Sequence, residues 1–109
     1  MGNPDKIKQA FATSFGTYDM TGLDALKSGV YESIHGGYDT TAASADPHRL
    51  VPLDVMRDVE KEGRIGGVYP FFGATCGVGT NVGSAEKMGR EWAKMLLDAK
   101  IGACILTST

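Results

Sequence analysis

The sequence predicts an α/β fold, in which helices flank a layered and mostly parallel sheet. An apolar stretch, a glycine-rich loop, an amphipathic helix and a second apolar stretch follow one another between Ile65 and Thr109. This order is typical of a right-handed βαβ unit, of the kind that forms part of a Rossmann-like domain. The chain has 109 residues, of which 42% are hydrophobic. Its size suits a single α/β domain over residues 1–109 or a fragment of a larger domain.

The amino-terminal part is expected to begin with a helix. Ile7, Phe11 and Phe15 repeat every four residues and so share one helix face, which predicts a helix from Asn3 to about Ser14. Turn-rich sequence follows this helix.

A strand, a loop and a second helix are expected next. The sequence predicts a short strand at residues 30–34 and an exposed loop at residues 40–49, in which His48 is solvated. Apolar residues at helical spacing then predict a helix that begins after Pro52 and ends at Gly63.

The carboxyl-terminal part gives the clearest pattern. A short strand is expected at residues 68–72, followed by a loop from Gly73 to Gly83. Ser84 is expected to cap a helix that reaches Lys100, about 25 Å long. The apolar run from Ile101 to Thr109 does not alternate, and it predicts a strand buried on both faces, with Cys104 in the core.

The charge balance excludes several classes of partner. Eleven basic and thirteen acidic residues give a formal charge of -2 without a block of like charges, so we expect no nucleic acid and no membrane as partners. No apolar run reaches the length of about 18 residues that spans a bilayer, and the amino end lacks the apolar core of a signal peptide. Two cysteines fit a reducing compartment, so a cytoplasmic location is expected. A short chain with part of a sheet leaves an apolar face uncovered, which favours a homo-oligomer or another partner.

Polar residues follow the predicted strands at three places, and this is where open α/β sheets place their functional crevice. At the first place, His35, Tyr38 and Asp39 could converge as a general acid or base with an orienting group. The alternative is a turn in which Asp39 bonds its own backbone and His35 lies on the surface. The other two places are the glycine loop and the terminal hydroxyl residues.

The glycine loop has three interpretations. Its Gly77, Gly79 and Gly83 partly match a dinucleotide-binding fingerprint, but no acidic residue follows at the end of the next strand. A small anion bound by the loop amides and a plain tight connection are the alternatives. Cys76, near the amino end of a helix, is either a reactive thiol or a small packing residue. Cysteines and histidines show no paired spacing, so no metal site is expected.

Four stretches of the sequence carry a resemblance to a known family: Ser33 to Asp39, Asp46 to Asp54, Glu60 to Gly63 and Ile105 to Thr109. Taken together, they resemble the selenoprotein subunit of component B of glycine reductase and its sarcosine and betaine counterparts. D-proline reductase, a related selenoprotein, is similar around the His-Gly-Gly-Tyr-Asp segment.

The resemblance implies a chain that stops before its reactive residue. In this family selenocysteine, encoded by UGA, directly follows the segment that matches Ile105 to Thr109, and a Gly-Thr-Cys stretch comes next. We therefore expect Thr109 to be a truncation point, and the truncated chain to be inactive alone. The family's chains are longer, so neither Met1 nor Thr109 is taken as a natural terminus.

The resemblance also implies an activity and partners. The family cleaves the carbon–nitrogen bond of glycine, sarcosine or betaine reductively. It uses a pyruvoyl group on a companion subunit, and a small selenoprotein is the acceptor. The resemblance implies no cofactor in this chain. The candidate catalytic residues are then His35, Tyr38 and Asp39. The candidate substrate-binding residues are Gly36, Gly37, Cys76, Gly77, Gly79, Thr107, Ser108 and Thr109. The alternatives are a module that binds a small anion or nucleotide at the Gly73 to Gly83 loop, and a purely structural domain.

Overall fold

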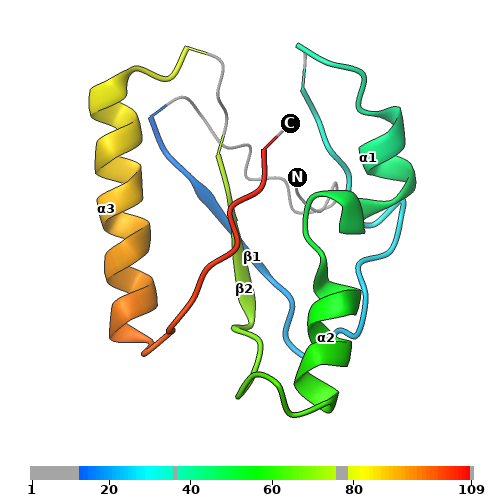
Figure 1. Cartoon of the computed structure of the whole chain (residues 1–109). Coiled ribbons are helices and arrows are strands. Elements are labelled where there is room, and N and C mark those ends of the chain that lie inside the picture. The colour runs from blue at the N-terminus through cyan, green and yellow to red at the C-terminus, as the bar shows by residue number, and fades with distance from the viewer. Residues whose placement is uncertain (1–12, 36, 76–78, 109) are drawn as a thin grey trace.

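The computed structural model describes residues 13–35, 37–75 and 79–108. The elements in chain order are β1 (Gly16–Asp19), α1 (Thr41–Ala45), the 3-10 helix η2 (Pro47–Arg49), α2 (Leu53–Lys61), β2 (Phe71–Ala74) and α3 (Val82–Asp98). Helix α3 lies on one side of the sheet, and α1 and α2 lie on the other (Figure 1). The helix predicted over residues 3–14 falls outside the described residues except for its last two positions. No helix of the described part is long and apolar enough to cross a membrane.

The sheet differs from the prediction. It consists of two antiparallel strands, β1 and β2, with Gly16 opposite Ala74 and Asp19 opposite Phe71. The predicted layered, mostly parallel and Rossmann-like sheet is therefore wrong. The prediction failed because an apolar run indicates burial but does not indicate the strand with which its backbone pairs. The pairing here joins segments more than fifty residues apart.

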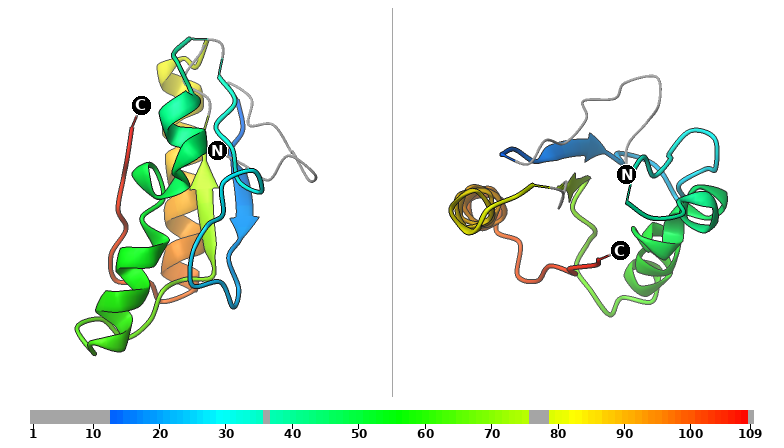
Figure 2. Two further views of the ribbon diagram at one scale, coloured as in Figure 1. Left: turned by 90° about the vertical axis from the view of Figure 1, so that its right-hand side faces the viewer. Right: turned by 90° about the horizontal axis from the view of Figure 1, so that it is seen from above.

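Two segments that were predicted as strands form none. Residues 30–34 contain one isolated bridge position within irregular chain, and residues 101–108 have no assigned secondary structure. Seen from above, the carboxyl-terminal segment lies across the centre of the molecule from the sheet (Figure 2). Cys104, expected in a core, is exposed for the same reason.

Helix α3 confirms the predicted helix but begins earlier. Asn81, not Ser84, is the capping residue, because its side-chain oxygen accepts a hydrogen bond from the Ser84 N–H at 2.8 Å. The helix ends in a Schellman motif, in which the N–H of Ile101 donates to Leu96 and the N–H of Lys100 donates to Leu97. Lys100 has a φ of 58° and so occupies the left-handed position that glycine usually takes. This turn sets the direction of the segment that follows.

The core lies between the sheet and α2. Phe72 of β2 is its centre: its ring stacks on Tyr18 of β1 at 5.0 Å and lies 6.3 Å from the ring of Tyr31. Burial raises the pKa of the Tyr31 hydroxyl, and the nearby Asp19 carboxylate raises it further. The buried residues of this cluster are Met20, Leu26, Tyr31, Leu53 and Phe72.

Helix α3 packs against β2 through the indole ring of Trp92. A Cβ added at Gly73 would lie 3.3 Å from two ring carbons of Trp92, so the glycine allows the close approach of strand and helix. The Trp92 ring also meets the edge of Phe15 at 5.5 Å. Met88, one turn earlier, is buried. The apolar stripe expected on this helix is thus confirmed at Met88 and Trp92.

His48 holds two segments together, and the expectation that it is solvated is wrong. Its Nε2 accepts a hydrogen bond from the Leu26 N–H at 2.9 Å. Its Nδ1 lies 3.3 Å from a carboxylate oxygen of Asp54 and 3.6 Å from one of Asp46. Because Nε2 is an acceptor here, the neutral ring carries its hydrogen on Nδ1, the nitrogen that lies near the two carboxylates. This histidine therefore acts as a structural link.

A second link ties α2 to two loops. Arg57 donates from Nε to the carbonyl oxygen of Leu23 at 2.9 Å and from Nη1 to Glu60 at 2.7 Å. The other carboxylate oxygen of Glu60 accepts from the Val68 N–H at 3.1 Å. The hydrogen bond from Arg57, followed by that from the Val68 N–H, lowers the pKa of Glu60 below its ordinary value of 4.5.

We expect Glu60→Gln to destabilise the chain in a pH-dependent way. The folded-state pKa of Glu60 is lowered, so its carboxylate stabilises the fold above pH 4.5, and this contribution is lost as the pH falls through the folded-state pKa. Urea unfolding should show the variant less stable than the parent at pH 7, with the difference shrinking below pH 4.5.

The matched control is Glu62→Gln. Within the described ranges Glu62 pairs with Arg64 alone, at 3.3 Å, and both side chains are more than half exposed. Its removal should change stability little at either pH. An equal loss for both variants, or a Glu60→Gln loss that persists unchanged in acid, would contradict the assigned role.

Candidate functional site

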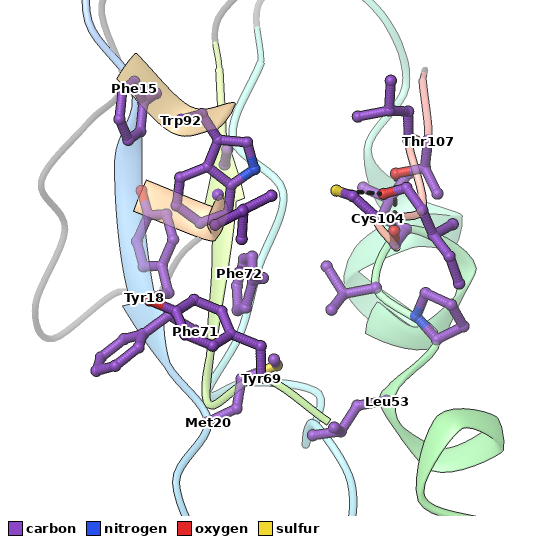
Figure 3. Close-up of a pocket in the computed structure, with 18 of the residues that line it drawn as sticks. Phe15, Tyr18, Met20, Leu53, Tyr69, Phe71, Phe72, Trp92, Cys104 and Thr107 are labelled. Carbon is purple, nitrogen blue, oxygen red and sulfur yellow. Dashed lines mark hydrogen bonds between the residues drawn. The ribbon is translucent and has the colours of Figure 1, made fainter. Parts of the chain in front are cut away.

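A wide cavity occupies the centre of the chain. Its volume is about 1800 Å³, and most of its wall is apolar. Aromatic side chains of the sheet and α3, among them Phe72 and Trp92, face it from one side, and Cys104 and Thr107 lie on the other (Figure 3). Polar groups enter the wall at Ser33 and Tyr38.

Ser33, His35 and Tyr38 form a polar cluster on this wall, called here the hydroxyl–imidazole cluster. Ser33 Oγ and Tyr38 Oη share a hydrogen bond in which either can be the donor. The rings of His35 and Tyr38 are 5.0 Å apart and tilted by 37°. All three residues line the cavity. The structure therefore brings two of the three predicted catalytic side chains together.

Helix α1 fixes the position of Ser33. The Ser33 N–H donates to the hydroxyl oxygen of Ser44 at 3.2 Å, and the Ser44 hydroxyl donates to the Ser33 carbonyl oxygen at 3.4 Å. Ser28 in turn donates to the Ser44 carbonyl oxygen at 2.7 Å. Ser33 is 6% exposed, the one buried polar residue of the described part. Ser33 was not predicted as a site residue, because a serine beside an apolar run gives no signal of burial.

His35 has a fixed ring orientation. Its Nδ1 accepts a hydrogen bond from the Gly37 N–H at 2.8 Å, so the neutral ring carries its hydrogen on Nε2. Nε2 is then the nitrogen that can donate a proton towards a ligand. The side chain is only partly exposed. One ring nitrogen of His35 therefore takes part in the turn, and the other nitrogen makes no hydrogen bond among the described residues.

Asp39 does not join the cluster. Its carboxylate accepts a hydrogen bond from the Thr41 N–H at 2.9 Å at the start of α1, and the residue is exposed and does not line the cavity. Hydrogen bonds from the side chain and backbone of Thr41 lower the pKa of Asp39. The carboxylate therefore organises the beginning of a helix, as the turn alternative proposed.

The hydroxyl residues near the carboxyl end lie on the opposite wall. Thr107 and Ser108 line the cavity, and the Thr107 hydroxyl donates to the Leu50 carbonyl oxygen at 2.8 Å. This hydrogen bond holds the end of the segment against the loop before α2. The same cavity is thus bounded by the hydroxyl–imidazole cluster and by Thr107.

The glycine loop contributes less than predicted in the part that is described. Gly73 and Thr75 of this loop line the cavity, whereas Gly79, with a φ of 71°, does not. Gly37, which belongs to the His35 segment, also lines it. Asn81 already accepts a hydrogen bond from one of the amides that an anion at the start of α3 would use. The remaining predicted substrate-binding residues lie outside the described residues: Gly36, Cys76, Gly77 and Thr109. In residues 13–35, 37–75 and 79–108 no three metal-binding side chains are grouped as ligands.

The described residues thus form a small protein of helices and a two-stranded sheet around a large, mainly apolar cavity. A sequence model of glycine/sarcosine/betaine reductase selenoprotein B (GRDB) matches residues 1–109, and the chain belongs to this family. The resemblance found in the sequence is therefore confirmed.

Relatives from all three kinds of reductase are similar to the chain over nearly its whole length. The sarcosine reductase complex component B subunit beta of Peptoclostridium acidaminophilum is 49% identical over 107 residues, which are 98% of this chain and 24% of that protein. The betaine reductase complex component B subunit beta of the same organism is 48% identical, with the same coverage. The glycine reductase complex component B subunit gamma of Carboxydothermus hydrogenoformans is 44% identical over 99% of this chain and 25% of its own length.

D-proline reductase is a more distant relative. Its subunit gamma from Acetoanaerobium sticklandii is 35% identical over 75 residues, which are 68% of this chain and 31% of that protein. The chain spans about a quarter of the length of the component B relatives, which are parts of complexes with several subunits. No solved structure matches the chain.

We expect the hydrogen bond within the hydroxyl–imidazole cluster to give a measurable coupling energy. Ser33→Ala and Tyr38→Phe each leave one partly buried hydroxyl without its partner, at a cost of about 1–3 kcal/mol. The double variant should lose less than the sum, with a coupling of about 0.5–1.5 kcal/mol. Urea unfolding of the four proteins measures it, and strictly additive losses would disprove the contact.

Proposed function

We propose that the chain is a fragment of the component B subunit of a glycine, sarcosine or betaine reductase complex, and that the complete subunit takes part in reductive cleavage of a carbon–nitrogen bond. The observation that carries this proposal is the identity of 44–49% over 98–99% of the chain to such subunits. Identities to the sarcosine and betaine proteins differ by a single percentage point, so the proposal is to the substrate class and not to one substrate.

The selenocysteine that the family name implies is proposed to follow Thr109 in the complete subunit. The residues next to that position suit a reactive anion and a small polar substrate, since Thr107 and Ser108 offer hydroxyls to the same cavity that His35 and Tyr38 line. A selenol is more acidic than a thiol, so it supplies a nucleophile that is ionised at neutral pH.

The chain's own side chains are proposed to handle protons and orientation. His35 presents Nε2–H, and Tyr38 presents a hydroxyl whose orientation Ser33 fixes. These groups would donate a proton where charge develops on a substrate held in the cavity. The apolar wall would exclude water and strengthen these interactions.

Partners and location follow from the same family. A companion subunit with a pyruvoyl group and a small selenoprotein acceptor are the proposed partners. Support comes from the relatives, whose names make them components of reductase complexes. We place the complex in the cytoplasm because the sequence has two cysteines and none of the dense cysteine spacing of small secreted proteins.

The gene provides the first test. We expect the codon after that of Thr109 to be an in-frame UGA, followed by codons for Gly-Thr-Cys and then by the remainder of a subunit about four times as long. A UAA or UAG codon followed by unrelated sequence would refute the proposed position of the selenocysteine.

The second test uses the complete subunit in its reassembled complex. His35→Gln and Tyr38→Phe should each lower kcat by about 10²- to 10⁴-fold, the range for loss of a general acid or base. Asp39→Asn is the matched control, because Asp39 lies within four residues of His35 but does not line the cavity, and it should leave kcat within a few-fold. A loss for Asp39→Asn as large as that for His35→Gln would contradict the assignment.

A further inference from the structure

The cavity is too large for the proposed substrates. Pockets that enclose small ligands measure about 300–1,000 Å³, whereas this one measures about 1800 Å³. Glycine, sarcosine and betaine are at the small end of such ligands and would leave most of the apolar wall in water. Protein interiors are packed as densely as organic crystals, and exposed apolar surface is unfavourable by about 25 cal/mol per Å². A larger apolar occupant would cover more of this wall.

The wall indicates the chemistry of what fills it. On one side, Tyr69 just before β2, Phe72 of β2 and Trp92 of α3 offer aromatic rings (Figure 3). Across the described residues that line the cavity, Glu32 and Lys100 are the fixed charges. A highly charged occupant would therefore lose its hydration without compensating partners. The wall fits an apolar occupant with few charges.

The opposite side offers unpaired backbone. Among the described residues, the one backbone hydrogen bond that the segment 101–108 makes to the rest of the chain is the helix-end bond of Ile101. Ile105 is 58% exposed and Leu106 is 87% exposed, although both line the cavity. Apart from the Ile105 carbonyl oxygen, which accepts a weak hydrogen bond from the Cys104 thiol at 3.7 Å, the backbone groups of residues 102–106 have no partner among the described residues. A run with such groups and exposed apolar side chains is a template on which another extended segment can pair.

We propose that an apolar segment of the complete subunit, from outside residues 1–109, inserts into this cavity between the aromatic wall and the segment 101–108. Its backbone pairs with residues 102–106, and its side chains pack on Phe72 and Trp92. The chain covers 24–25% of the length of its component B relatives, so about three quarters of such a subunit lies outside the matched region and can supply the segment. This inference rests on the proposed function in one respect, namely that the chain is part of a longer subunit, and it does not depend on which substrate is reduced.

Thiol labelling of the complete subunit provides the first test. Cys104 is exposed in the chain of 109 residues, and it lines the cavity. Labelling with iodoacetamide, followed at the Cys104 peptide by mass spectrometry, should be at least tenfold slower in the complete subunit than in residues 1–109 alone. Equal rates would overturn the proposal.

A charge introduced on the segment provides the second test. Leu106→Glu should leave the stability of residues 1–109 nearly unchanged, because Leu106 is 87% exposed there. In the complete subunit the same change should lower the Tm by at least about 4 °C, since it places a charge against the inserted segment. Leu106→Met, which keeps an apolar side chain, should change Tm by no more than about 1–2 °C. The same small shift for Leu106→Glu in both proteins would refute the insertion.

A photo-cross-link identifies the occupant. With p-benzoylphenylalanine at position 69 of the complete subunit, the cross-linked peptide should come from the same molecule and from outside residues 1–109. Mixing isotope-labelled and unlabelled subunits distinguishes an inserted segment from a second copy of the chain. Cross-links to a second copy, to a companion subunit or to residues 1–12 would each overturn the proposal. None of these readouts requires activity, so this inference and the proposed function can fail separately.

Discussion

The packing of Phe72 onto Tyr18 is the contact on which the rest of the structure depends. It joins two short strands that are far apart in sequence, and it brings Met20, Tyr31 and Leu53 into one core. Strands of four residues are too short to be stable on their hydrogen bonds alone, so the aromatic contact and the burial behind it hold the sheet together. Trp92 of α3 approaches Gly73 of β2, and Leu53 of α2 joins the same core, so the sheet positions one residue of each helix beside the cavity.

Sequence patterns predicted the helices better than the sheet. The apolar stripe of α3 is local information, so its presence could be read directly, and only its cap was misplaced, from Asn81 to Ser84. The strand β1 has no comparable signal, because Gly16–Asp19 becomes a strand through its partner at Phe71–Ala74. The run that begins at Ile101 was the reverse case: its composition is typical of a buried strand, yet no strand partner exists for it in the described chain.

The candidate site was predicted in part, for a similar reason. His35 and Tyr38 could be found because a histidine and a tyrosine beside glycines are unusual in type and spacing. Ser33 could not, since its role comes from a hydroxyl of α1 that packs against it, and a helix at Thr41–Ala45 was not expected. Asp39 has a side chain suited to proton transfer, but its carboxylate points to the Thr41 N–H and not into the cavity. Side-chain direction depends on tertiary packing, and composition does not encode it.

The left-handed Lys100 at the end of α3 has a mechanical consequence for the last stretch of chain. This stretch is held at both ends, by the turn at Lys100 and by the hydrogen bond from the Thr107 hydroxyl to the Leu50 carbonyl oxygen. Its middle residues can therefore shift while its two ends keep their positions. A segment bound in the cavity would then displace Ala103 and Cys104, while Thr107 would keep its position.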